Sequence, residues 1–151
     1  MANTQAMCTS FKAEILSGIH ALGTTVIRAG TGADTIKAAL YLASATVNAA
    51  TTAYSATGEV SGTGYSAGGI TVTNATAPTS SGTTAYWTPS ASFTYTTVTL
   101  TTSFDCVLVY NSTQSNKAIS AHTFGAQTIT AGTFVLSMPT NDSTNALIRI
   151  A

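Results

Sequence analysis

The sequence predicts a mainly β protein, a jelly-roll-like β-sandwich with a short N-terminal helix. Roughly six to eight short apolar or β-branched runs alternate with clusters of Gly, Ser, Thr and Asn, which is typical of sandwiches and jelly rolls. Threonine, whose branched hydroxyl side chain suits either face of a sheet, occurs 31 times. No change in composition marks a second domain, so we expect residues 1–151 to form a single domain.

The N-terminal arm, residues 1–23, carries the only convincing helix pattern. Its apolar side chains recur at spacings of four, four and three, which places them on one helical face: Phe11, Ile15, Ile19 and Leu22. Ser10 is expected to cap the start of this helix, and Gly23 stands where the helix would stop.

The remaining elements are expected to be strands, at residues 35–43, 70–73, 92–102, 104–111, 127–138 and 145–151. Residues 104–111 are apolar nearly throughout and are expected at the centre of the sheet. Residues 127–138 are either a strand pair or one strand broken at Gly132. The pattern of 92–102 alternates, which predicts two unlike faces, with Phe93, Tyr95, Thr97 and Thr99 opposite Thr94, Thr96, Val98 and Leu100. Turns are expected at residues 58–69, 77–84, 111–116 and 139–145.

Charge is scarce, at 7% of residues against about 25% in an ordinary soluble domain. Five basic and five acidic residues balance, and no window of five residues holds two basic side chains. This argues against steering toward nucleic acid or anionic membranes. No apolar run approaches the roughly 20 residues of a membrane span. Because little charge keeps copies apart, we expect the protein to work in an oligomer or an assembly.

The two cysteines, Cys8 and Cys106, are expected to be free thiols. Met1–Ser10 lacks the basic and apolar regions of a signal peptide, which favours a reducing, intracellular setting. Whether the two side chains meet stays open.

The glycine-rich stretch Gly58–Gly69, "GEVSGTGYSAGG", superficially matches a phosphate-binding loop. A P-loop needs a lysine directly after its last glycine, and none occurs between Lys37 and Lys117. The spacing of Gly62, Gly64 and Gly68 departs from the dinucleotide fingerprint, and a strand pattern follows where a helix is required. We therefore expect these glycines to supply positive φ at turns or bulges.

Metal binding and catalysis find little support. A zinc site from Cys8, His20, Cys106 and His122 would require four distant single ligands, whereas structural sites use close pairs. His20 is expected on a polar helix face and His122 in a loop or at a strand end. The five acids are spread singly and no Gly-x-Ser-x-Gly elbow is present. We expect no enzyme activity, no cofactor and no metal.

Tyr86 and Trp87 precede Pro89 in an expected polar loop. Exposed aromatic side chains could stack on a sugar or anchor a partner. The alternative is a buried position in the core or at a hinge, which is the commoner fate of aromatic residues.

The order of segments resembles a family of small structural proteins of tailed bacteriophages. The similar segments are "FKAEILSGIH", "DTIKAALYLASATVNAATTAYSATGEVSGTGYSAGGITVT" and "CVLVYNSTQSNKAISAHTFG". The resemblance extends from Phe11 to about Met138, is most specific in Gly58–Gly69 and is weakest in Pro78–Pro89.

The resemblance implies a capsid cement or decoration protein with a jelly-roll-like fold. Such a protein would be made in the host cytoplasm, bind the outer capsid surface of the virion and clamp adjacent major capsid protein subunits as a small homo-oligomer, a dimer or trimer. A tail location remains open. The alternative is a tail- or fibre-associated protein that binds carbohydrate through Trp87, Tyr86 and Tyr95, and a further possibility is a hydrolase dependent on His122 or His20.

Overall fold

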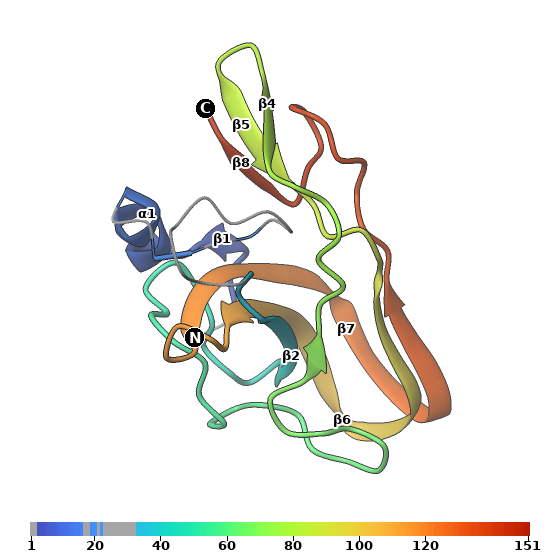
Figure 1. Cartoon of the computed structure of the whole chain (residues 1–151). Helices are drawn as coiled ribbons and strands as arrows, with labels where there is room; N and C mark the ends of the chain where they lie inside the picture. The colour runs from blue at the N-terminus through green and yellow to red at the C-terminus, as the bar shows by residue number, and fades with distance from the viewer. Residues whose placement is uncertain (1–2, 17–18, 21, 23–32) are drawn as a thin grey trace.

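A computed structural model of the chain describes residues 3–16, 19–20, 22 and 33–151. These residues form two antiparallel sheets and one short helix, α1 (Figure 1). The larger sheet has the strand order β1-β7-β6-β2-β3, and the smaller has the order β4-β5-β8. The prediction of a mainly β protein is therefore confirmed. The elements are β1 (Ala6–Met7), α1 (Thr9–Leu16), β2 (Ile36–Leu42), β3 (Ile70–Thr71), β4 (Thr79–Ser81), β5 (Thr84–Trp87), β6 (Phe93–Asn111), β7 (Lys117–Leu136) and β8 (Ile148–Ile150).

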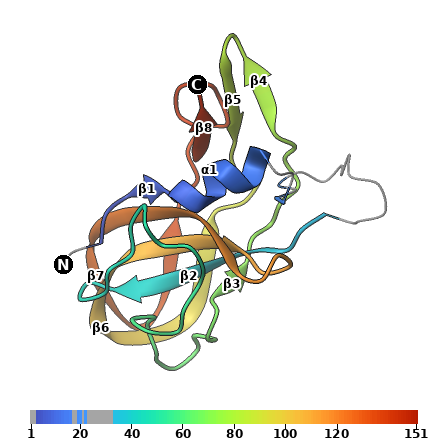
Figure 2. The ribbon, with the colours of Figure 1, turned by 90° about the vertical axis from the view of Figure 1, so that its left-hand side faces the viewer.

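The strands β6 and β7 form one long antiparallel ribbon around which the larger sheet is built (Figures 1 and 2). The expected strands at 92–102 and 104–111 are one continuous strand, β6, and Gly132 lies inside the continuous strand β7. The part of β6 from Phe104 to Asn111 is central, as predicted, because β2 pairs with it on the side away from β7. The expected strand at 35–43 is confirmed as β2.

The helix is shorter than its apolar pattern predicts. It spans Thr9–Leu16, so Ile19 and Leu22 lie beyond its end, and Gly23 lies outside the described residues. Ser10 is not the cap but lies within the first turn, and its buried hydroxyl finds no hydrogen-bond partner. The main chain is held instead by tertiary contacts, because the Cys8 and Thr9 amides donate to the carbonyls of Ile119 and Ala49.

The predicted alternation in 92–102 is wrong beyond Tyr95, because β6 contains a bulge. Thr97 has a φ of 54°, and the register with β7 shifts between Tyr95 and Val98. A bulge adds one residue to one strand and so exchanges the two faces beyond it. As a result Val98 and Leu100 are buried on the same side as Phe93 and Tyr95, while Thr97 is exposed.

Of the smaller sheet, only β8 was expected from the sequence, as the final strand at 145–151, and the structure limits it to Ile148–Ile150. Residues 77–84 were predicted as a turn but include β4 and the first residue of β5, which form a hairpin that projects from the body (Figure 1). The residue pair Tyr86–Trp87 lies in β5 and not in a loop. β5 pairs with β8, which joins the C-terminal residues to the hairpin and brings Trp87 opposite Ile148. Threonine and serine strands of this length carry too weak an apolar pattern to be distinguished from loops.

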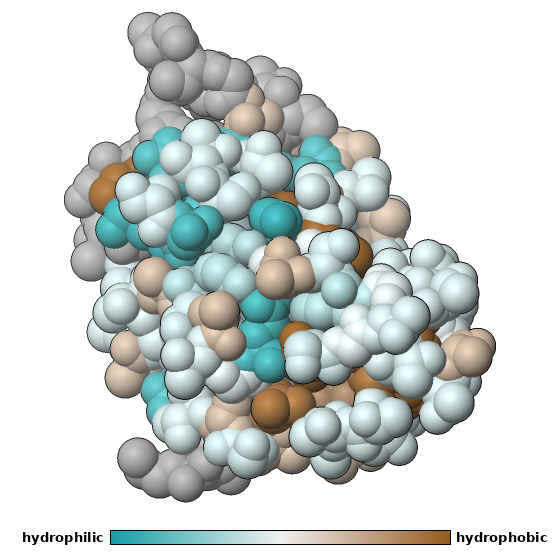
Figure 3. All heavy atoms as spheres, turned by 90° about the horizontal axis from the view of Figure 1, so that it is seen from below, coloured by the Kyte–Doolittle hydropathy of each residue, from teal (hydrophilic) through white to brown (hydrophobic). Residues whose placement is uncertain are grey.

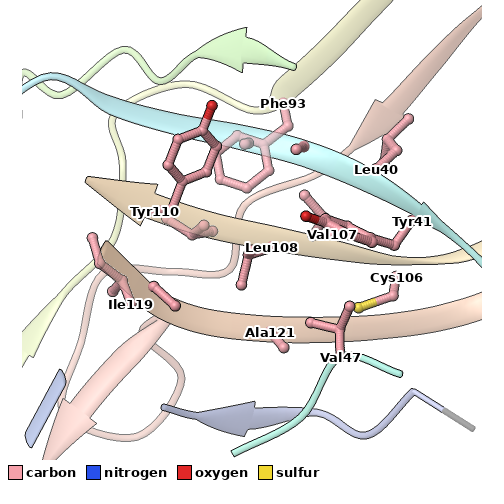
Figure 4. Close-up of a cluster of buried hydrophobic side chains, with 14 of the residues drawn as sticks. Leu40, Tyr41, Val47, Phe93, Cys106, Val107, Leu108, Tyr110, Ile119 and Ala121 are labelled. Atoms are coloured by element: carbon pink, nitrogen blue, oxygen red, sulfur yellow. The ribbon is translucent and has the colours of Figure 1, made fainter. Parts of the chain in front are cut away.

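The main core lies under the larger sheet, where side chains from β2, β6 and β7 meet (Figure 4). Leu40, Val107, Leu108 and Ile119 are each at most 1% exposed. Tyr110, at 2% exposure, is satisfied by donating its hydroxyl to the Gly68 carbonyl at 2.8 Å. This core fixes β2 against β6, and β2 in turn supports the loop that carries the glycine-rich stretch.

Candidate interaction surface

The β6–β7 ribbon presents a broad surface that carries almost no charge. No charged residue occurs between Glu59 and Asp105 or between Lys117 and Asp142. On β6 the exposed side chains are mostly hydroxylic: Thr94, Thr96, Thr97, Thr101, Thr102 and Ser103. The end of the molecule seen from below is mostly of intermediate hydropathy, with scattered apolar areas and several strongly hydrophilic ones (Figure 3). Such a surface suits contacts governed by shape, because small hydroxyl side chains lose little rotamer entropy when they are buried.

An aromatic cluster stiffens the ribbon on the face opposite the exposed threonines of β6. Phe134 of β7 packs edge-on against Phe104 of β6, with ring centroids 5.1 Å apart, and Phe124 lies 5.2 Å from Phe134. Tyr95 joins the cluster at 6.1 Å from Phe134. These separations are those of favourable aromatic pairs. The cluster therefore holds together two strands whose pairing is interrupted by five register shifts.

The glycine-rich stretch closes the free side of β6, which explains its composition. A Cβ at Gly62 would overlap the carbonyl oxygen of Thr99, and one at Gly64 would overlap that of Thr97. This close approach lets Thr99 donate its amide to the Thr63 carbonyl at 2.9 Å. Gly58, Gly64, Gly68 and Gly69 all have positive φ, so the expected structural role of these glycines is confirmed.

Glu59 anchors the same loop through a half-buried network. Its Oε1 accepts hydrogen bonds from the Tyr65 hydroxyl at 2.8 Å and the Gly68 amide at 2.7 Å, and its Oε2 accepts from the Tyr54 hydroxyl at 2.6 Å. The Tyr65 hydroxyl in turn accepts from the Leu40 amide of β2. Burial, together with the hydrogen bond to Glu59, raises the pKa of both Tyr54 and Tyr65. The network therefore ties the loop to β2 and to Tyr54.

His122 lies in the middle of β7 and not in a loop or at a strand end as expected. Its Nε2 is 2.9 Å from the Ser120 hydroxyl, and burial lowers the pKa of His122 to about 4. A neutral histidine beside a serine is the beginning of a nucleophile and base pair. Ser120 is only 2% exposed, however, so its oxygen is closed to a substrate in this conformation. His122 also lines a polar hollow of about 420 Å³, together with residues that include Gln5, Asn145 and Arg149.

His20 lies beyond the end of α1 and not on a polar helix face. Its ring packs edge-on against Phe11, with centroids 4.7 Å apart, and its Nδ1 lies 3.1 Å from the side-chain amide of Asn111. The same amide donates to the buried carboxylate of Asp34 at 2.7 Å. His20 thus contributes to a buried polar cluster at the end of β6.

The two cysteines are buried in one core, and neither forms a disulfide. Burial raises the pKa of Cys106 to about 12, and Cys8 is close enough to add to that shift. Within the described part of the chain, no three His, Cys, Asp or Glu side chains are grouped so as to hold a metal ion.

The aromatic residues of the carbohydrate hypothesis do not form a stacking platform. Trp87 is 1% exposed and donates its indole N–H to the Thr76 carbonyl at 2.9 Å. Tyr95 is 3% exposed and donates to the Ala38 carbonyl. Both are core residues, which for Trp87 confirms the alternative of a buried position, and Tyr86 keeps a half-buried ring. The apolar groove beside Trp87, lined also by Phe11, Ile15 and Ile150, measures about 210 Å³, below the 300 to 1,000 Å³ typical of small-molecule sites.

Comparison with known proteins found no matching family model, curated protein or solved structure. Among the described residues, no helix has the length and apolar character needed to cross a bilayer.

The sequence reasoning missed the ribbon as a surface, although one signal for it was present. The second uncharged stretch falls largely on β7, and the first ends in the start of β6, where the exposed positions are threonines and Ser103. What could not be foreseen is that bulges would turn these threonines to solvent together. Bulges depend on pairing with the partner strand, and a single strand pattern does not reveal them.

Proposed function

We propose that this chain is a non-enzymatic capsid cement or decoration protein of a tailed bacteriophage, which binds the outer capsid surface and bridges adjacent major capsid protein subunits. The proposal rests first on the sequence resemblance over most of the chain. The observation that carries it in the structure is the uncharged, hydroxyl-rich face of the β6–β7 ribbon.

The ribbon suits this role for physical reasons. A clamp needs a large, stiff area of contact, and the aromatic cluster on one side and the glycine-rich loop on the other hold the ribbon in shape. Hydroxyl side chains can donate or accept hydrogen bonds across an interface without the desolvation cost of burying a charge. Many copies on one particle add modest contacts into strong overall attachment.

The finer description of the fold as a jelly-roll-like sandwich belongs to the same proposal. Two antiparallel sheets are compatible with such a sandwich. So is the position of β2, which pairs with β3, the next strand in sequence, and with β6, which is distant in sequence. An experimental structure of the protein on its particle would decide the topology.

The test is to locate the protein in purified virions by cryo-electron microscopy and to measure its copy number per particle. We expect density on the outer shell at positions set by capsid symmetry. Density on the tail alone, or none on the particle, would contradict the proposal.

The ribbon itself can be tested with particles stripped of the protein. The double variant T94K/T96K, on the exposed face of β6, should reduce re-binding at least about tenfold because it buries charge in the contact. The matched variant T79K/S81K places the same charges on the exposed strand β4 of the smaller sheet. Equal loss in both variants would point to a general charge effect and not to the ribbon.

A further inference from the structure

The outer edge of β7 beyond Thr123 differs from the other sheet edges of the described structure. The strands β1 and β3 have two residues each, and β4 and β8 have three. The free side of β6 is covered by the loop through Thr63 and by Ala43, whose amide donates to the Ser103 carbonyl. β1 pairs with β7 only at Ser120 and Ala121. From there to Leu136, the described main chain forms no backbone hydrogen bond with the outer edge of β7.

This edge lacks most of the features that normally prevent strands from associating. In natural proteins, charge, proline, short strand length or bulges keep edge strands from pairing with other chains. β7 has no charged residue after Lys117 and no proline. Its irregular parts lie near residues 124–126 and 130–131, where β7 has extra residues relative to β6 and Ala131 has a φ of 47°. The last five residues, Gly132–Leu136, follow these bulges and include Val135, a large apolar side chain that is 48% exposed.

We propose that Gly132–Leu136 pairs antiparallel with the same segment of a second copy of this chain, across a twofold axis. Five residues is about the mean length of a natural strand. The unpaired N–H and C=O groups of an edge require an extended strand as partner, and the copy supplies one of the same length. A twofold contact brings identical surfaces together, so any charge on the segment would face a like charge on the partner. Gly132–Leu136 carries no charge and therefore permits the contact. The pairing would also cover Val135.

A charge-swap experiment on the full chain tests this pairing. Thr133 and Val135 are both exposed, so we compare T133K/V135K with T133E/V135E. In wild-type protein, sedimentation and light scattering should show a dimer. Each variant alone should be monomeric or dimerise at least about tenfold more weakly, because like charges face one another across the edge. An equimolar mixture of the Lys and Glu variants should recover the dimer.

The control is T79K/S81K, which makes the same change of charge on β4 and should dimerise like the wild type. Circular dichroism checks that each variant is folded. A monomeric wild type, a trimer, unaltered dimers in both variants, or a mixture that fails to recover would each overturn the proposal. The inference does not depend on the capsid proposal, since a monomer that still binds capsids would refute only the pairing.

Discussion

The hydroxyl of Tyr65 donates to Glu59 Oε1 at 2.8 Å and accepts the Leu40 amide at 3.0 Å, so one side chain ties the glycine-rich loop to β2. Two further donors, the Tyr54 hydroxyl and the Gly68 amide, complete the coordination of the carboxylate. A half-buried carboxylate with three donors is well stabilised, whereas loss of the carboxylate would leave buried donors without partners.

The Glu59–Tyr65 pair should therefore show energetic coupling. We expect E59Q and Y65F each to lower the free energy of unfolding by about 1–3 kcal/mol. The double variant should cost less than the sum, with a coupling of about 0.5–2 kcal/mol. Denaturant unfolding gives the free energy of unfolding of the wild type, the two single variants and the double variant. Y86F is the control, because the Tyr86 hydroxyl forms no hydrogen bond with a described residue. Strict additivity would show that the hydrogen bond contributes nothing.

Gly69 should be the least replaceable glycine of the loop. Its φ is +70°, and a Cβ there would overlap the carbonyl oxygen of Ala38 in β2. We expect G69A to lower the free energy of unfolding by at least about 2 kcal/mol, from backbone strain and overpacking together. Gly125 has no positive φ, and a Cβ there would meet only the Gln127 side-chain amide at 4.0 Å, so G125A should stay within about 0.5 kcal/mol of wild type. Similar melting temperatures for the two variants would argue against this account of the loop.

His122 should make the protein sensitive to mild acid. Burial lowers its pKa from 6.5 to about 4, so the folded protein holds the ring neutral while the unfolded chain binds a proton. Its contribution to stability is present above pH 6.5 and is lost as the pH falls toward 4, by up to about 3 kcal/mol in total. H122Q removes the titrating ring, so its stability should fall less steeply over this range. Parallel stability curves for the two proteins would refute the assignment.

The turn between β6 and β7 offers a stabilising substitution. Ser115 and Asn116 both have positive φ, at 52° and 58°, and the Lys117 amide donates to the Gln114 carbonyl, which is the pattern of a type I′ turn. Asparagine tolerates this conformation better than serine. We expect S115N to raise the free energy of unfolding by about 0.5 kcal/mol and the β-branched S115V to lower it by about 1 kcal/mol or more. The reverse order in thermal melts would contradict the turn assignment.

Much of the architecture was open to prediction because local chemistry dictates it. The apolar run at 35–43 and the segment 104–111 have the length and composition of buried strands, and both form the centre of the larger sheet. The glycines of 58–69 were recognised as conformational because no lysine or helix accompanies them. The predicted extent of the helix, as far as Ile19 and Leu22, was wrong, because the spacing of apolar residues does not show where tertiary contacts stop supporting a helical turn.

By itself, the sequence determined the mainly β class, the near absence of charge and the structural character of the glycine-rich stretch, since each follows from residue type and spacing. Only the tertiary structure decided which threonines face solvent, because the bulge at Thr97 reverses the faces of β6. It also decided that Trp87 and Tyr95 are buried and that no described strand pairs with the outer edge of β7 beyond Ala121. These features depend on pairing between strands far apart in the chain, and local patterns carry no information about such partners.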